Sequence, residues 1–179
     1  KSGENIHLTI ATNLQKFASE RLKGMSASSV LIDIKSGDIL SLVSTPSYNP
    51  NNFVLGISQS DWNALLNDER KPLLNKATSG AYPPGSTFKM VVAAAALELG
   101  LIGLNDKIFC AGFYELGSRK FHCWLKGGHG KLTLQEGIQK SCDVYFYELA
   151  RKVGVKRIGD MARRLGLGQA YNLPLTGLS

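Results

Sequence analysis

Two short stretches of the chain carry residue types that could together perform nucleophilic catalysis. In the first, Ser86 lies three residues before Lys89 and directly after Pro83-Pro84-Gly85. The prolines prevent a helix upstream, and we expect an apolar helix to begin at the serine itself. Residues three apart share one helix face, so the Lys89 amine can reach the Ser86 hydroxyl. A neutral amine there could make serine a nucleophile without a histidine, although a capping serine beside a solvated lysine fits the same pattern.

The second stretch is Ser141-Cys142-Asp143, at the junction of two expected helices. A hydroxyl and a carboxylate at such a junction could project into a cleft. Asp143 could equally be the N-cap of the second helix, because aspartate is a favoured capping residue. The second stretch therefore points to catalysis only in combination with Ser86 and Lys89.

A separate group of residues has the ligand types of a metal site. Cys110, Cys123, His129 and Cys142 are separated by 12, 5 and 12 intervening residues and include all three cysteines of the chain. Three thiolates and one imidazole would complete a tetrahedral zinc site, structural rather than catalytic. The absence of a Cys-x-x-Cys pair leaves two alternatives, a Cys110–Cys123 disulfide with the third thiol free or three buried thiols. His122 is a weaker alternative ligand.

The elements that must position these residues are a hairpin and several helices. Residues 30–34 and 39–43 are apolar runs on either side of a short turn that contains glycine, which predicts a β-hairpin. Both runs are almost continuously apolar, so we expect both faces to be covered. Two strands do not form a stable sheet alone, so we expect other strands to complete it. Helical spacing and capping residues predict helices over 14–22, 61–66, 88–99, 133–140, 143–152 and 155–165.

Composition excludes several classes of protein. The chain has 179 residues, of which 44% are hydrophobic and 20% charged, as in soluble globular domains, so disorder is not expected. The longest apolar run, 90–97, is too short to cross a membrane. Three cysteines exclude a disulfide-dense mini-protein.

The net charge of +7 arises in one region. Between Arg119 and Arg164 there are 11 basic and 4 acidic residues, whereas the remainder is balanced at 10 and 10. Such an excess of basic residues could bind nucleic acid, anionic lipid or an acidic partner, but solvated helix faces show the same pattern. No aromatic interleaving or nucleic-acid module accompanies it, so we expect no nucleic-acid partner.

Together the two catalytic stretches match a known signature. Ser-x-x-Lys followed by Ser-x-Asn/Asp and Lys-Thr-Gly is typical of penicillin-binding proteins and serine β-lactamases. Residues 75–89 resemble the nucleophile region of class B transpeptidases, and residues 31–50 resemble the paired strands that open their catalytic domain. Residues 128–130 and 141–147 resemble the elongation-specific group, penicillin-binding protein 2. Asp143 also fits this group, because the septal enzymes have asparagine there.

This resemblance implies an α+β fold of the β-lactamase/transpeptidase type. Residues 1–179 would be a partial transpeptidase domain, rich in helices, with one β-hairpin of the central antiparallel sheet and truncated before the remaining strands. The Lys-Thr-Gly motif is absent, since Leu175-Thr176-Gly177 lacks the lysine and follows the second motif too closely. In the family that motif lies on a later strand, so the fragment could be inactive.

The resemblance also implies a reaction, a D,D-transpeptidation that crosslinks peptidoglycan stem peptides during cell elongation. Ser86 would attack the penultimate D-alanine carbonyl, and Lys89 would accept the serine proton directly. Ser141 would relay a proton to the leaving D-alanine, and Asp143 would hold the local geometry. β-Lactams would acylate the same serine, and no cofactor is implied for catalysis.

Partners and location follow from the same resemblance. A glycosyltransferase of the elongation machinery would bind regions outside this chain. The domain would lie at the periplasmic face of the bacterial inner membrane, anchored by an upstream segment. This compartment favours the disulfide, but a metal at Cys142 would hold the second catalytic stretch in place, so zinc and the disulfide both stay open.

Two alternatives with the same fold stay open. A serine β-lactamase needs a base that activates water for deacylation, and neither Glu115 nor Glu136 has a recognisable signature around it. A non-catalytic penicillin-sensing module would keep both the serine and the lysine.

Overall fold

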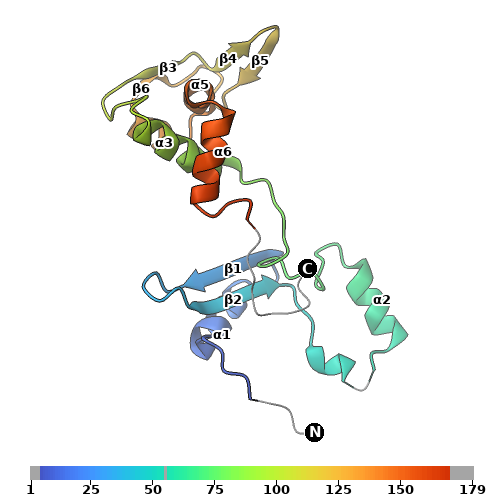
Figure 1. The fold of residues 1–179 in the computed structure, drawn as a ribbon. Coiled ribbons are helices and arrows are strands. Elements are labelled where there is room, and N and C mark those ends of the chain that lie inside the picture. Colours follow the sequence, from blue (N-terminus) through green and yellow to red (C-terminus); the bar gives the residue numbers. More distant parts are fainter. Residues whose placement is uncertain (1–4, 55, 170–179) are drawn as a thin grey trace. The chain divides into compact units, whose positions relative to one another are not determined.

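The structure is a computed structural model that describes residues 5–54 and 56–169 (Figure 1). These residues fall into two compact units, one ending at Tyr82 and the other beginning at Pro83. Leu175-Thr176-Gly177 lies outside the described residues. The described part of the chain holds no helix of the length and hydrophobicity that a membrane span requires.

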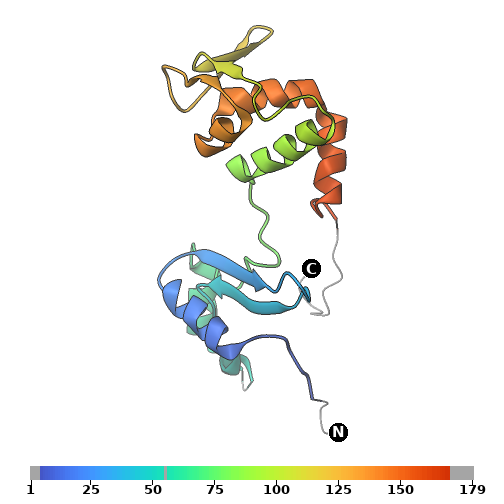
Figure 2. The same cartoon turned by 90° about the vertical axis from the view of Figure 1, so that its left-hand side faces the viewer.

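The first unit is built on the predicted hairpin. Strands β1 (Ala27–Ile32) and β2 (Ile39–Thr45) pair antiparallel. Helix α1 (Thr12–Arg21) packs on β2, and the Gln15 side chain both donates to the Leu42 carbonyl and accepts from its N–H, each at 2.8 Å. The 3₁₀ helix η1 (Pro50–Phe53) and helix α2 (Gln59–Asn67) follow. Figure 2 shows α1 lying along the hairpin.

The prediction that both faces of the hairpin are covered is wrong for the described residues. Strand β2 alternates between buried and half-buried residues, but Val30, Leu31 and Ile32 of β1 are 43–51% exposed. The physical reason is that this sheet has two strands, and the described chain supplies α1 as the helix that packs on it.

The second unit has a helical core with two small sheets beside it. Helix α3 (Lys89–Glu98) packs against α5 (Asp143–Val153) and α6 (Val155–Arg164), and the short α4 (Leu134–Gln139) contacts α3. The pairs β3 (Ile108–Cys110) with β6 (Gly130–Leu132), and β4 (Phe113–Leu116) with β5 (Arg119–His122), are antiparallel (Figure 1). The most deeply buried core side chains include Ala96, Leu132, Tyr145 and Leu149.

Helix starts in this unit confirm one prediction and correct two. Thr133 and Glu136 form the predicted capping box of α4. The apolar helix does not begin at Ser86, because residues 85–88 form a separate 3₁₀ turn, η2, before α3. The N-cap of α5 is Cys142 rather than Asp143, which is the first residue of the helix.

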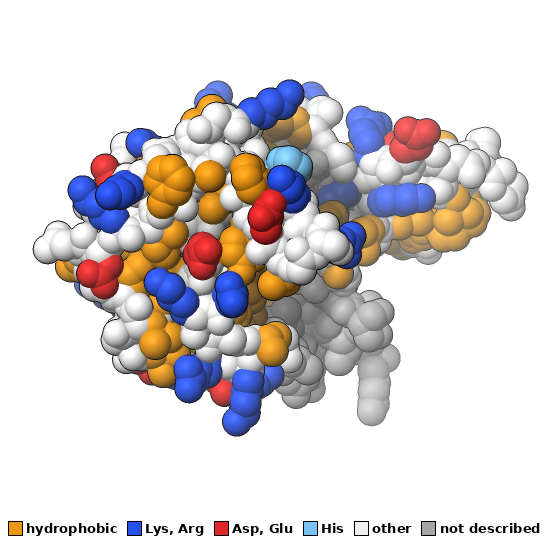
Figure 3. Space-filling model, turned by 90° about the horizontal axis from the view of Figure 1, so that it is seen from above, with side chains coloured by type: hydrophobic (Ala, Val, Ile, Leu, Met, Phe, Trp, Pro, Cys, Tyr) orange, Lys and Arg blue, Asp and Glu red, His pale blue; other side chains and the backbone are white. Residues whose placement is uncertain are grey.

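Basic residues are dispersed over the face of the second unit that Figure 3 shows. Figure 3 shows Lys and Arg side chains scattered among acidic and hydrophobic ones rather than gathered in one continuous patch. Arg163 pairs with Asp160 at 2.6 Å on α6, and Arg164 pairs with Glu98 of α3. Some basic side chains of this region are therefore paired with neighbouring carboxylates.

Candidate active site and an adjoining cysteine–histidine cluster

The backbone before α3 aligns Ser86 with Lys89. Gly85 adopts φ +55°, a conformation that glycine reaches without strain, and the chain then enters η2 (Gly85–Phe88). A 3₁₀ helix has about three residues per turn, so side chains three apart stand one above the other. Ser86 is exposed and Lys89 is partly buried at the start of α3.

The turn between α4 and α5 places Ser141 in a strained conformation. The Ser141 N–H donates to the Ile138 carbonyl and the Cys142 N–H donates to the Gly137 carbonyl, each at 3.0 Å. These two bonds form a Schellman motif, whose left-handed residue is usually glycine. Here that residue is Ser141, with φ +47°, so the turn keeps a hydroxyl at the cost of backbone strain.

The four predicted catalytic residues lie together in one hydrogen-bonded chain. The Ser141 hydroxyl is 2.9 Å from the Ser86 hydroxyl, and Lys89 Nζ donates to Ser141 Oγ at 3.0 Å. Lys89 Nζ also donates to the Ser141 carbonyl at 2.8 Å and to Asp143 Oδ1 at 2.7 Å. The expected direct contact between Ser86 and Lys89 is thus replaced by a link through Ser141, because the three Nζ–H donors point toward the Ser141–Asp143 turn.

The charges of the site balance locally. Lys89 and Asp143 form an ion pair in which the side chains are 15% and 27% exposed, and the Lys89 ammonium also lies 5.8 Å from the centre of the Phe146 ring. Asp143 occupies the first turn of α5, where the helix dipole favours a carboxylate. Its second oxygen, Oδ2, accepts from the Trp124 backbone N–H at 3.2 Å.

The residue that sequence reasoning missed is Trp124. Besides that backbone contact, its indole Nε1 donates to the Lys140 carbonyl at 3.1 Å, and its ring meets His129 edge-on with centroids 5.1 Å apart. The one signal in the sequence was its position directly after Cys123 and next to a predicted metal ligand.

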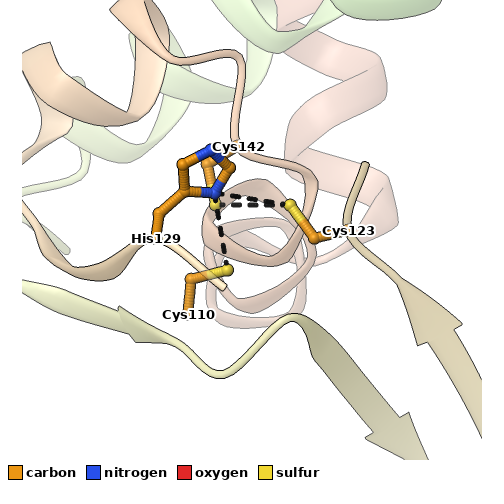
Figure 4. A group of neighbouring side chains, drawn as sticks. All are labelled: Cys110, Cys123, His129 and Cys142. Carbon is orange, nitrogen blue, oxygen red and sulfur yellow. Dashed lines mark hydrogen bonds between the residues drawn. The ribbon is translucent and has the colours of Figure 1, made fainter. Parts of the chain in front are cut away.

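The predicted metal ligands also converge, as Figure 4 shows. One ligand atom from each of Cys110, Cys123, His129 and Cys142 lies within 4.8 Å of all the others. The three cysteines are free thiols, so the Cys110–Cys123 disulfide is not formed in this structure. His122, the weaker alternative ligand, is exposed on β5 and does not belong to this group.

The distances within this Cys–His cluster fit tetrahedral zinc. His129 Nδ1 lies 3.7 Å from Cys110 Sγ and 3.5 Å from Cys123 Sγ, and the latter lies 3.9 Å from Cys142 Sγ. Zn–S bonds of about 2.3 Å and Zn–N bonds of about 2.0 Å require ligand atoms roughly 3.5–3.8 Å apart at tetrahedral angles. The donor set and its spacing therefore fit Zn²⁺.

The electrostatics of the cluster point the same way. Burial raises the pKa of the Cys142 thiol to about 12, a penalty on the thiolate that a bound cation would remove. Burial also opposes ionisation of Cys123, but hydrogen bonds to its sulfur from the backbone of Leu125, Val144 and Asp143 outweigh it and lower the pKa of this thiol. Two of these groups belong to the first turn of α5, which favours negative charge at the sulfur.

Comparison with known proteins places these observations in context. A family model described as the penicillin binding protein transpeptidase domain matches residues 27–178. The peptidoglycan D,D-transpeptidase MrdA of Escherichia coli K12 is 42% identical over 177 residues, which is 98% of this chain and 28% of that protein. The chain thus spans little more than a quarter of the curated relative.

Solved structures give the same assignment. Pseudomonas aeruginosa PBP2 in complex with WCK 5153 superposes with a TM-score of 0.89 at 38% identity, covering 96% of this chain and 40% of that one. A ceftriaxone acyl-enzyme complex of penicillin-binding protein A from M. tuberculosis superposes with a TM-score of 0.83 at 29% identity, covering 94% and 41%.

Proposed function

The chain belongs to the penicillin-binding protein transpeptidase family, and we propose that it carries the nucleophile of a peptidoglycan D,D-transpeptidase of the penicillin-binding protein 2 type. The observation that carries this proposal is the hydrogen-bonded chain from Ser86 through Ser141 to Lys89, closed by Asp143. It combines an exposed hydroxyl, a proton relay and an amine, which are the parts that serine acyl transfer requires.

In the acylation step, Ser86 Oγ bonds to the penultimate D-alanine carbonyl carbon of a stem peptide. The Ser86 proton passes to Ser141 Oγ while the Ser141 proton passes to Lys89, which has to be an unprotonated amine at that moment. Hydroxyl groups both donate and accept, so the relay can run in this direction without moving a heavy atom. The backbone N–H of Ser86 lies in the first turn of η2, free of helix partners, and supplies one oxyanion donor.

When the D-alanine leaves, later in the same acylation step, the proton travels back along the same groups. Lys89 returns its proton through Ser141 to the leaving D-alanine nitrogen, and Asp143 keeps the Lys89 amine directed at Ser141. An amine of a neighbouring strand then attacks the carbonyl carbon of the acyl-serine and forms the crosslink; the ester bond to Ser86 Oγ breaks, and the proton that the amine loses returns through Lys89 and Ser141 to Ser86. A β-lactam presents a strained amide to the same serine and would leave a stable acyl-enzyme.

Two acidic residues between the motifs, Glu115 and Glu136, have partners that favour a transpeptidase over a β-lactamase. Glu115 pairs with Lys120 at 2.9 Å on the β4–β5 hairpin, and Glu136 is held in the α4 capping box. Each carboxylate is therefore engaged within its own element, and neither is directed at Ser86 to activate water.

We also propose that the Cys–His cluster holds a structural Zn²⁺. Cys110 is the last residue of β3, Cys123 directly follows β5, His129 lies in the loop before β6, and Cys142 lies in the α4–α5 turn (Figure 4). Bound zinc would supply a crosslink between these elements, whose strands are too short to be stable alone.

Zinc content tests this part of the proposal. Purified full-length protein should contain one zinc per chain, and Co²⁺ in its place should give the absorption of tetrahedral thiolate coordination. His129→Ala should lose the metal, whereas the matched control His122→Ala should keep it. Equal metal content in both variants would refute the assignment.

Location and partners are proposed on the family alone. The domain would work at the periplasmic face of the inner membrane, held by an anchor upstream, beside a glycosyltransferase of the elongation machinery. Both belong to the whole protein rather than to the residues described by the structure.

Intact mass after penicillin treatment tests the catalytic proposal. The full-length natural protein should gain one stable penicilloyl adduct, and Ser86→Ala should gain none. Rapid loss of the adduct with turnover of penicillin would indicate a β-lactamase instead. A stable adduct without turnover of a D,D-peptide substrate would indicate a sensor, and no adduct would end the enzyme proposal.

A further inference from the structure

The conformation of Ser141 needs an explanation, because the relay depends on it. Its φ of +47° is unfavourable for a residue with a side chain by roughly 1 kcal/mol. Rotation about the bond between the Ser141 nitrogen and Cα would relieve this strain by turning the Lys140–Ser141 peptide. That rotation would also move the hydroxyl relative to Ser86 and Lys89. Something must therefore oppose the turning of this peptide.

One side chain binds the peptide in question. The indole Nε1 of Trp124 donates to the Lys140 carbonyl at 3.1 Å, which is the oxygen of the Lys140–Ser141 peptide. This carbonyl is also one of the last of helix α4, and such carbonyls lack partners within the helix. If the peptide turned, the carbonyl would leave the indole, so the hydrogen bond opposes the rotation.

Trp124 is itself fixed on three sides. Its backbone N–H donates to Asp143 Oδ2 at 3.2 Å, on the other side of the same turn. Its ring contacts His129 edge-on, and the preceding residue, Cys123, is a member of the Cys–His cluster. The backbone and the ring of Trp124 thus both have partners next to the turn that its indole N–H binds.

Burial does not account for a tryptophan at this place. Trp124 is 63% exposed and lines an open depression of about 610 Å³ together with Gly128 and Ser141. Most of its apolar area stays in water, so the hydrophobic contribution to folding is small. What the residue contributes within the described chain is its N–H and its edge-on contact with the cluster.

We propose that Trp124 is a positioning residue for acylation: its indole N–H holds the Lys140–Ser141 peptide and so keeps the Ser141 hydroxyl between Ser86 and Lys89. The inference rests on the proposed function, because it assigns Trp124 to the same relay. Loss of the N–H should slow the chemical step and leave ligand binding unchanged.

An isosteric replacement gives the sharpest test. In full-length zinc-loaded protein, Trp62→Phe first removes a tryptophan of the other unit, where it meets the Phe53 ring at 6.2 Å. Benzothienylalanine is then placed at position 124, which replaces the indole N–H by sulfur and keeps the ring shape. The matched control carries 5-fluorotryptophan, which keeps the N–H.

The readout separates binding from chemistry. Penicillin acylation is followed at several concentrations to obtain the dissociation constant and the acylation rate constant. For one lost hydrogen bond, the rate constant should fall about tenfold in the benzothienyl protein, with the dissociation constant, zinc content and thermal midpoint unchanged. The fluorotryptophan protein should behave like its parent, and Trp124→Phe should behave like the benzothienyl protein.

Other results would overturn the inference. An unchanged acylation rate constant would show that the indole N–H does not hold the Lys140–Ser141 peptide in place. A weaker dissociation constant with an unchanged rate constant would make Trp124 a ligand contact, and a parallel loss of thermal midpoint would make it a structural residue. Failure of the parent protein to form any adduct would instead refute the proposed function.

Discussion

The candidate active site and the Cys–His cluster share one tripeptide but are built in opposite ways. Ser141 and Asp143 bind Lys89 in a polar, partly exposed network, whereas Cys142 between them is fully buried. The polar network is held by hydrogen bonds and includes a strained backbone. The Cys–His cluster has closely spaced thiols and a helix N-terminus beneath them. The comparison teaches that a partly exposed polar network with a strained backbone adjoins, through a single residue, a buried cluster of sulfur and imidazole groups.

The largest expected effect concerns the polar network around Lys89. Lys89→Met removes the amine, and because a positioned acid–base group contributes about 10²–10⁴-fold, the penicillin acylation rate should fall by that factor. Stopped-flow or intact-mass kinetics would measure it. Lys152→Met, an exposed lysine late in α5, is the matched control and should acylate normally. Equal rates in the two variants would remove Lys89 from the mechanism.

Disruption of the Cys–His cluster should lower the stability of the protein and not only its reactivity. Chelation of zinc should lower the unfolding free energy by about 3 kcal/mol, the value for a ligand present at roughly 100 times its dissociation constant. Calorimetry with and without chelator would measure this. The Cys110→Ser variant should have a lower unfolding free energy without chelator, and chelator should not change it, because the variant already lacks one of the proposed metal ligands. Sensitivity equal to that of the unaltered protein would contradict a zinc ligand at Cys110.

The strain at Ser141 gives a smaller effect that separates stability from activity. Ser141→Gly and Ser141→Ala both remove the relay hydroxyl, so both should acylate slowly. Only glycine adopts this left-handed backbone conformation without strain. The unfolding free energy of Ser141→Gly in urea should therefore exceed that of Ser141→Ala by about 1 kcal/mol. Equal stability of the two variants would show that the turn is not strained.

The smallest effect concerns the helix that carries the turn. Hydrogen bonds from the Thr133 backbone and side chain lower the pKa of Glu136 in the α4 capping box. Its contribution to stability is complete above its unfolded pKa of about 4.3 and is lost as the pH falls through the lower folded value. Glu136→Gln should therefore be slightly less stable than the parent at pH 7, and this difference should vanish in acid. Urea unfolding at several pH values would show it, and a difference that persists in acid would exclude the carboxylate as its source.

The sequence predicts the residues of both sites better than their geometry. Helix α4 and the hairpin follow from a capping box and from apolar runs around a turn, which are local signals. The four small strands between residues 108 and 132 were missed, because three or four residues are too few to show alternation. The left-handed turn at Ser141 was missed because its signal, a glycine, is absent. The link of Ser86 to Lys89 through Ser141 depends on residues more than 50 positions apart, which no local pattern contains.

The alternation of contacts along Ser141-Cys142-Asp143 has a consequence for how this segment can change over time. Neighbouring residues serve opposite sides, the outer two the lysine and the middle one the sulfur cluster. A single inserted or deleted residue would therefore change the spacing between the contacts to the lysine and the contact to the sulfur cluster. Substitution of Ser141 or Asp143 therefore removes a side-chain contact to the lysine and substitution of Cys142 removes a sulfur from the cluster, whereas a change in the length of the tripeptide would displace both sets of contacts.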